Sequence, residues 1–187
     1  LITPVRLKQN EDYMWELAGK QIDTFIASGE CEFMGAYAQP FAVLVVSDLL
    51  GVPPEDRIQF RKHLIRQERE GAGIGGTSGA VEHSPLTWLY DTFSAYIEDR
   101  RRNPTGDILT GLAQATFPDG SVPEPIDVAR VASNLFAAGQ ETTVRLLSYA
   151  FQTVGERPDL QQRLRADRSL IPNFVEECLR IEGPVKG

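Results

Sequence analysis

The longest run of regularly spaced apolar residues covers residues 126–154, and it predicts one long helix. Its apolar residues recur three or four positions apart, which places them on one helical face. These residues are Val128, Val131, Ala132, Leu135, Phe136, Gly139, Leu146, Leu147, Ala150 and Val154. At 1.5 Å per residue the helix is about 40 Å long, roughly the width of a domain. We therefore expect it to cross the core.

Most of the remaining sequence also has helical spacing, and strand-like alternation is nearly absent. Proline and glycine signals bound the expected helices. Those helices cover residues 10–28, 33–50, 55–69, 86–102, 108–115, 158–165 and 172–181. The sequence therefore predicts an all-α fold in which residues 1–187 form a single helical domain.

Residues 70–84 interrupt this pattern. They are rich in glycine and serine, which predicts a flexible loop. The loop contains a Gly-x-Gly-x-x-Gly spacing at Gly71, Gly73 and Gly76. A phosphate-binding loop of that pattern would follow a strand and open a helix, and the sequence offers neither.

Composition and charge narrow the class of protein. With 42% hydrophobic and 24% charged residues, the chain is ordinarily globular. A net charge of −7 argues against nucleic-acid binding, which needs a basic face. The basic cluster Arg100 to Arg102 ends a helical pattern, where positive charge complements the helix dipole. Two distant cysteines predict no disulfide framework, and neither a membrane span nor a signal peptide is evident. We expect a cytoplasmic protein that binds no membrane.

The middle of the long helix departs from its own pattern. Residues 138–143 read Ala-Gly-Gln-Glu-Thr-Thr, although Gly139 costs about 1 kcal/mol relative to alanine inside a helix. We expect the Thr142 hydroxyl to bond back to the Ala138 carbonyl and to bend the helix. Small residues also let a ligand approach the backbone. The predicted result is a shallow groove lined by carbonyls, a hydroxyl and the Glu141 carboxylate.

This stretch resembles the [AG]-G-x-[DE]-T-[TS] signature in the long central helix of the cytochrome P450 family, the haem-thiolate monooxygenases. A second match, at residues 177–180, reads Glu-Cys-Leu-Arg and is similar to the family's ExxR helix. Residues 29–33, 49–57 and 103–112 resemble the middle section of soluble bacterial members. Together these matches span nearly the whole chain in order, so the fold implied is the central helical portion of that family.

The resemblance implies a haem-dependent monooxygenase that inserts oxygen from O2 into a small, mainly apolar organic substrate. A ferredoxin- or flavodoxin-type protein would supply the electrons. The loop at residues 70–84 would be a hinge between two helices that lid the substrate pocket, although a disordered linker is the alternative.

The resemblance also assigns roles within the long helix. Thr142 would donate a hydrogen bond to iron-bound oxygen, and Glu141 would relay protons from solvent. In a water-poor pocket, side chains must deliver the protons. A neutral hydroxyl is less costly to bury there than a charge. The alternative is an exposed polar pair on an amphipathic helix. The residues expected beside the haem are Ala138, Gly139, Thr142 and Thr143, and those expected beside the substrate are Asn134 and Ala137.

In the second motif, helical spacing places both Glu176 and Glu177 within reach of Arg180, as an exposed ion pair. The resemblance selects Glu177. It also implies that the pair is buried and structural, positioning the haem-binding side without a chemical role.

The sequence departs from the family in its cysteines. The family holds its iron through a cysteine in a glycine-bearing loop after the ExxR helix, and neither Cys31 nor Cys178 lies in such a loop. His63 and His83 form no metal-ligand cluster with them. We expect the axial ligand and an N-terminal sheet region to lie outside this chain, a central fragment that is inactive alone. The alternative is a non-catalytic helical scaffold without haem.

Overall fold

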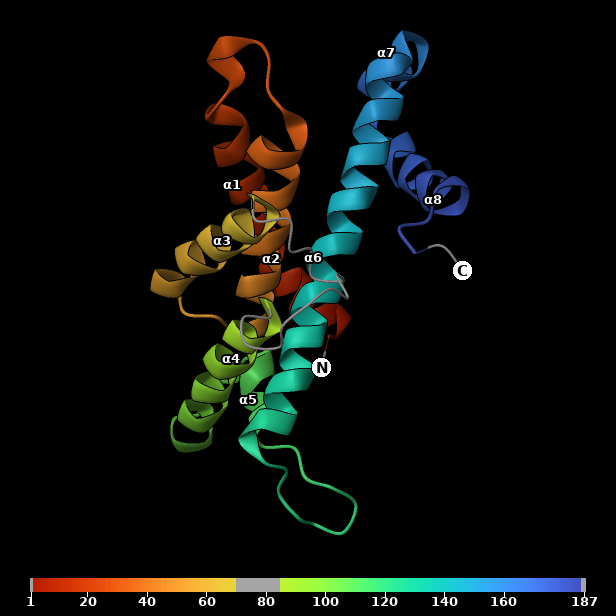
Figure 1. Cartoon of the computed structure of the whole chain (residues 1–187). Coiled ribbons are helices and arrows are strands. Elements are labelled where there is room, and N and C mark those ends of the chain that lie inside the picture. The colour runs from red at the N-terminus through yellow and green to blue at the C-terminus, as the bar shows by residue number, and fades with distance from the viewer. Residues whose placement is uncertain (1, 70–84, 186–187) are drawn as a thin grey trace.

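The computed structural model describes residues 2–69 and 85–185, and every regular element in these ranges is helical (Figure 1). The α-helices are α1 (Pro4–Asp23), α2 (Gln39–Leu50), α3 (Pro54–Arg69), α4 (Pro85–Arg102), α5 (Ile108–Ala113), α6 (Pro125–Glu156), α7 (Pro158–Ala166) and α8 (Ile171–Ile181). Short helices η1 (Ile26–Ser28), η2 (Met34–Ala38) and η4 (Arg168–Leu170) join them. The all-α prediction is confirmed. The loop predicted at 70–84, with His83, lies outside the described residues.

Local signals explain where the helices begin and end. The Thr3 side chain accepts a hydrogen bond from the Arg6 N–H, and Pro4 occupies the first turn, so α1 begins six residues before the predicted start. The predicted helix at 33–50 is divided, because η2 has π-helical geometry before α2 begins. Gly155, one residue beyond the predicted end of the long helix, lies inside α6.

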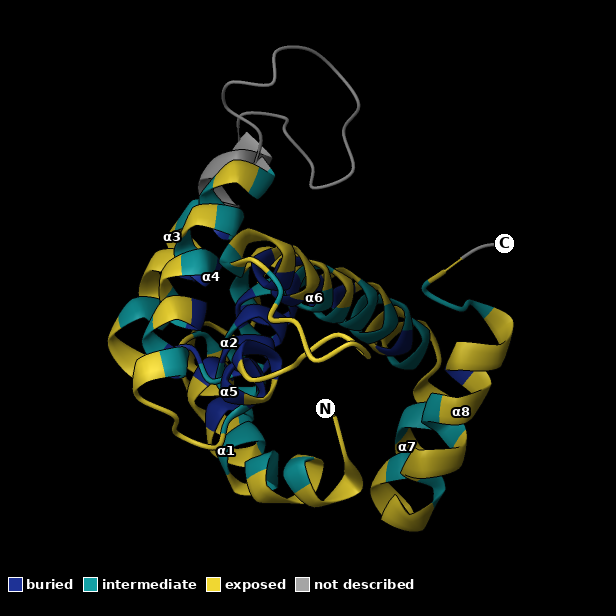
Figure 2. Cartoon of the chain, turned by 90° about the horizontal axis from the view of Figure 1, so that it is seen from below, coloured by how far each residue is buried: buried dark blue, intermediate teal, exposed yellow. Residues whose placement is uncertain are grey.

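The main core forms where α2, α3, α4 and α5 meet the first half of α6, as the buried residues in Figure 2 show. Three fully buried aromatic rings meet there. The Phe136 ring of α6 lies 5.2 Å from Phe60 and 6.1 Å from Phe93, measured between ring centroids. This burial, rather than helix propensity, fixes the position of α6.

The buried side chain of Arg100, near the end of α4, joins that helix end to the end of α2 and the start of α5. Arg100 Nε donates to Asp107 Oδ2 at 2.8 Å, and its Nη2 donates to the Gly51 carbonyl at 3.1 Å. Asp107 also caps α5 by accepting from the Thr110 N–H at 2.6 Å. Burial would raise the pKa of Asp107, but hydrogen bonds from Thr110, Arg100 and Thr105 outweigh it and hold that pKa below its usual range. Arg100 therefore does more than complement a helix dipole.

The second half of α6 extends beyond this core, with α1 and α2 on one side and α7 and α8 on the other (Figure 1). In α7 and α8 one residue, Cys178, is buried. Cys178 thus packs as a small buried residue.

Candidate functional site

One face of α6 lies opposite the core and is not covered by the described part of the chain. At about 100° per residue, the core-facing positions include Phe136 and Val144. The opposite positions, here called the outer face, are Val131, Ala138 and Thr142, and each is exposed or half-buried. An outer face with small and apolar side chains halfway along the central helix is the candidate site.

Two adjacent carbonyls at this site accept threonine hydroxyls. Thr142 Oγ1 donates to the Ala138 carbonyl at 2.6 Å, as predicted. Thr143 Oγ1 donates to the Gly139 carbonyl at 2.7 Å. The two bonds lie on neighbouring sides of the helix, so Thr142 faces outward while Thr143 faces α2.

Glu141 has a different partner from Thr142. Its carboxylate, about half exposed, forms an ion pair with Arg145, which also donates to the Pro184 carbonyl at 3.1 Å. The acid and the threonine hydroxyl therefore lie side by side in sequence but point about 100° apart around the helix. A proton relay through Glu141 stays a prediction.

The small residues suggested that a ligand could approach the backbone at Gly139. The space next to the Gly139 Cα is instead filled. A Cβ built on Gly139 would lie 2.9 Å from Cγ2 of Val46. The close neighbour at this glycine is thus a buried side chain of α2. Gly139 thus permits close packing of α2 against α6, and its placement beside the haem stays a prediction.

The remaining predicted site residues flank the outer face. Asn134 is exposed and lies about 80° from Thr142 around the helix, whereas Ala137 is half-buried and lies about 140° away. Their assignment to a substrate pocket stays a prediction.

The second motif forms its expected pair, but on the surface. Arg180 Nε and Nη2 donate to Glu177 Oε2 at 2.9 and 2.7 Å, so the choice of Glu177 over Glu176 is confirmed. The hydrogen bond from Arg180 lowers the pKa of Glu177. The two side chains are 57% and 68% exposed, so the expectation of a buried pair is wrong for the chain as described. No described segment packs over this face of α8.

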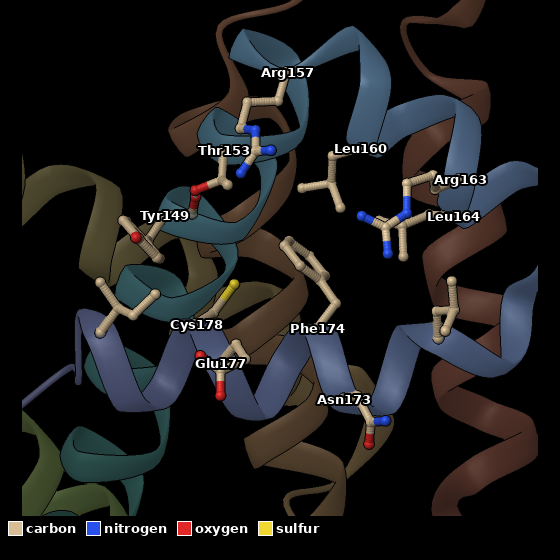
Figure 3. A pocket seen from close by; sticks show the side chains of 12 residues that line it. Tyr149, Thr153, Arg157, Leu160, Arg163, Leu164, Asn173, Phe174, Glu177 and Cys178 are labelled. Carbon is tan, nitrogen blue, oxygen red and sulfur yellow. The ribbon is translucent and has the colours of Figure 1, made fainter.

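Sequence reasoning missed an apolar groove of about 350 Å³ between α6, α7 and α8 (Figure 3). Tyr149 and Thr153 line it from α6, Leu160 from α7, and Phe174 and Cys178 from α8. The apolar residues of the last two helices carried the signal, but their spacing gave no indication of which helix they would face. Burial raises the pKa of the Cys178 thiol.

Metal-ligand clusters and membrane-spanning helices are both absent from the described ranges. No cluster of three His, Cys, Asp or Glu side chains in residues 2–69 and 85–185 is placed to hold a metal ion. Within the same ranges, no helix combines the length and apolar character needed to cross a bilayer.

Comparison with known proteins places this geometry in a family, although no family model matches the sequence. The cytochrome P450 monooxygenase PikC of Streptomyces venezuelae is 31% identical over 173 residues, which cover 91% of this chain and 40% of PikC. Cytochrome P450 CYP107DY1 of Priestia megaterium is 26% identical over 183 residues, or 98% of this chain and 44% of that protein.

Solved structures agree. Substrate-free Mycobacterium marinum cytochrome P450 CYP150A6 is 57% identical and superposes with a TM-score of 0.81, covering 96% of this chain and 40% of that one. Streptomyces peucetius CYP105P2 is 27% identical with a TM-score of 0.80, covering 95% and 44%. The arrangement of helices around α6 is therefore the helical portion of a haem-thiolate oxygenase fold. The chain belongs to the cytochrome P450 family and spans about two fifths of the length of these relatives.

The outer face fits part of the haem group that this family implies. Ala138 presents only a methyl group, and the exposed Val131 supplies apolar surface on which a flat macrocycle could pack. Neither cysteine suits the axial position. Cys178 lies within α8 and is buried, and Cys31 lies in the exposed loop that joins η1 to η2.

Proposed function

We propose that the protein containing this chain is a haem-dependent monooxygenase that inserts one oxygen atom into a small, mainly apolar organic substrate. The supporting observation is the uncovered outer face of α6, with Ala138 and Thr142 at its centre, in a chain of the cytochrome P450 family. Haem would supply oxygen activation, with an axial cysteine outside this chain and electrons from a ferredoxin- or flavodoxin-type partner.

Thr142 would hold and donate a proton at the outer face. Its hydroxyl bonds to the Ala138 carbonyl, which as an α-helical carbonyl also accepts the Thr142 N–H. A helical threonine has two accessible χ1 rotamers, so its hydroxyl can turn away from Ala138. Releasing one such hydrogen bond costs about 1 kcal/mol. The hydroxyl is therefore available to a ligand on the outer face.

Glu141 would connect this hydroxyl to solvent. Its ion pair with Arg145 is exposed, and exposed pairs at this spacing contribute roughly 0.3–0.5 kcal/mol. The carboxylate can therefore leave Arg145 and turn toward Thr142 at little cost. Asn134 and Ala137, which flank the outer face one to two turns earlier, would contact the substrate.

A test is Thr142→Ala in the full-length protein, with Thr142→Ser as the control that keeps the hydroxyl. We expect product formed per electron consumed to fall by at least about tenfold in Thr142→Ala, because a positioned proton donor contributes roughly 10²-fold or more. Thr142→Ser should retain most of the coupling. Unchanged coupling in Thr142→Ala would rule out the assigned role.

The second candidate, a helical scaffold without haem, is favoured by the positions of Cys31 and Cys178. An absorption scan of the purified 187-residue chain after haem addition distinguishes the two. A carbon monoxide difference band of the thiolate-ligated type would refute the scaffold for this chain. The absence of any Soret band would support it.

A further inference from the structure

The helices α2 and α6 approach each other closely at Gly139. Val46 of α2 is 7% exposed, and a Cβ on Gly139 would lie 2.9 Å from its Cγ2 and 3.7 Å from its Cβ. Cβ contacts shorter than 3.0 Å essentially do not occur in folded proteins. Any side chain at position 139 therefore requires either that Val46 yields or that the two helices separate.

The packing on both sides of this contact leaves little room for adjustment. Val43 and Val46 belong to the main core with Phe136, whereas Ala42 packs in a second buried cluster with Val144. Gly139 thus lies between two close-packed regions of the same helix pair. An added methyl group would displace the middle of α6 rather than tilt one end, because well-packed interiors transmit such strain.

The displaced turn is the one that carries the candidate site. The Gly139 carbonyl accepts the Thr143 hydroxyl, and the preceding carbonyl, of Ala138, accepts the Thr142 hydroxyl. Because Ala138 and Gly139 are consecutive, a movement of the Gly139 Cα moves the Ala138 carbonyl and the Thr142 side chain with it.

We propose that Val46 is a positioning residue: packed against Gly139, it sets the separation of α2 and α6 and thereby the location of the Thr142 hydroxyl on the outer face. The structural part of this inference stands on the contact alone. Its catalytic consequence rests on the function proposed above.

The first experiment records threonine-methyl NMR spectra of the 187-residue chain. Gly139→Ala should shift the Thr142 and Thr143 methyl resonances, and adding Val46→Ala should return them toward their original positions, because it removes the Cγ2 that the new methyl group meets. Gly155→Ala is the matched glycine control, because nothing lies within 4 Å of a Cβ built there. Val43→Ala is the matched core control on α2.

Two results would overturn the inference. One is that Gly139→Ala leaves both methyl resonances in place. The other is that Val43→Ala restores them as well as Val46→Ala does, since the effect would then be general loosening of the core. Should Gly139→Ala not fold, Val46→Ile enlarges the same contact from the opposite side by one methylene and must move the same two resonances.

The second experiment measures product formed per electron in the full-length protein. Gly139→Ala should reduce it by about tenfold, since a displacement of 1 Å at a reacting group costs up to roughly 10²-fold. Adding Val46→Ala should recover at least half of the parent value. Shifted resonances with unchanged coupling would overturn the catalytic consequence. A full-length parent that forms no thiolate–carbon monoxide band contradicts the proposed function alone, while the NMR result still decides the contact.

Discussion

Glycine occurs twice in α6, and its two positions have opposite surroundings. Gly139 faces Val46 at a distance that excludes a Cβ, whereas Gly155 faces open space. Helix propensity alone would favour alanine at both positions. The contact with α2 therefore decides which glycine is required by the fold.

Substituting each glycine by alanine separates these effects. Gly155→Ala should raise the free energy of unfolding by up to about 1 kcal/mol through helix propensity. Gly139→Ala should lower it by about 1–3 kcal/mol, because overpacking outweighs the same gain. Urea denaturation followed by circular dichroism measures both. Equal stabilisation by the two substitutions would show that Val46 gives way freely.

At the residue scale, the sequence predicts contacts between residues that are close together in the chain. The bond from the Thr142 hydroxyl to the Ala138 carbonyl follows from a spacing of four residues, and the structure confirms it. The neighbour of Gly139 could not be predicted, because Val46 is 93 residues away in the sequence and only the packing of α2 on α6 brings it there.

At the scale of elements, Asp107 and Arg100 join the ends of α2, α4 and α5. Its carboxylate receives the Arg100 guanidinium and caps α5, and both side chains are largely buried. Removing one member of a buried pair leaves the other without compensation, which is more costly than the net contribution of the pair itself.

Asp107→Asn keeps the cap and removes the charge, so it tests this junction. The folded-state pKa of Asp107 is lowered, so its contribution is fully present above the unfolded value of about 3.9 and is lost as pH falls through the folded pKa. We expect Asp107→Asn to destabilise the chain by about 1–3 kcal/mol at pH 7 and by progressively less in acid. Unfolding midpoints between pH 2 and pH 7 measure this loss of stability, with Asp91→Asn at an exposed position of α4 as the control. If the midpoints of Asp107→Asn and of the parent changed in parallel with pH, the role of the Asp107 charge would be contradicted.

Element boundaries show the same division between local and non-local causes. The long helix predicted at 126–154 is observed at Pro125–Glu156, because its apolar spacing continues to both ends. The π-helical turn Met34–Ala38 was not predicted. Its apolar residues fit an α-helix equally well, and no local signal specifies the wider turn.

At the scale of the whole molecule, burial depends on segments beyond any motif. The Glu177–Arg180 pair has the partner that the family resemblance selects, yet it is exposed on α8. The outer face of α6 is likewise uncovered. The pairing follows from the spacing of the two residues within one helix, whereas burial of the pair requires other segments to pack over α8. The relatives are more than twice as long as the region that matches.

Glu177→Gln therefore should act differently in the two lengths of protein. In the 187-residue chain, exposure screens the pair, so we expect no measurable change in the unfolding midpoint. In the full-length protein, if further segments cover α8, Arg180 would be left buried without its partner, and the unfolding equilibrium should shift by about 10²-fold or more. Glu176→Gln, one residue away, is the control and should have little effect in either. Equal, small effects of Glu177→Gln in both lengths would mean that this face of α8 stays on the surface in the complete protein, and that the motif stabilises the fold there no more than any other exposed pair.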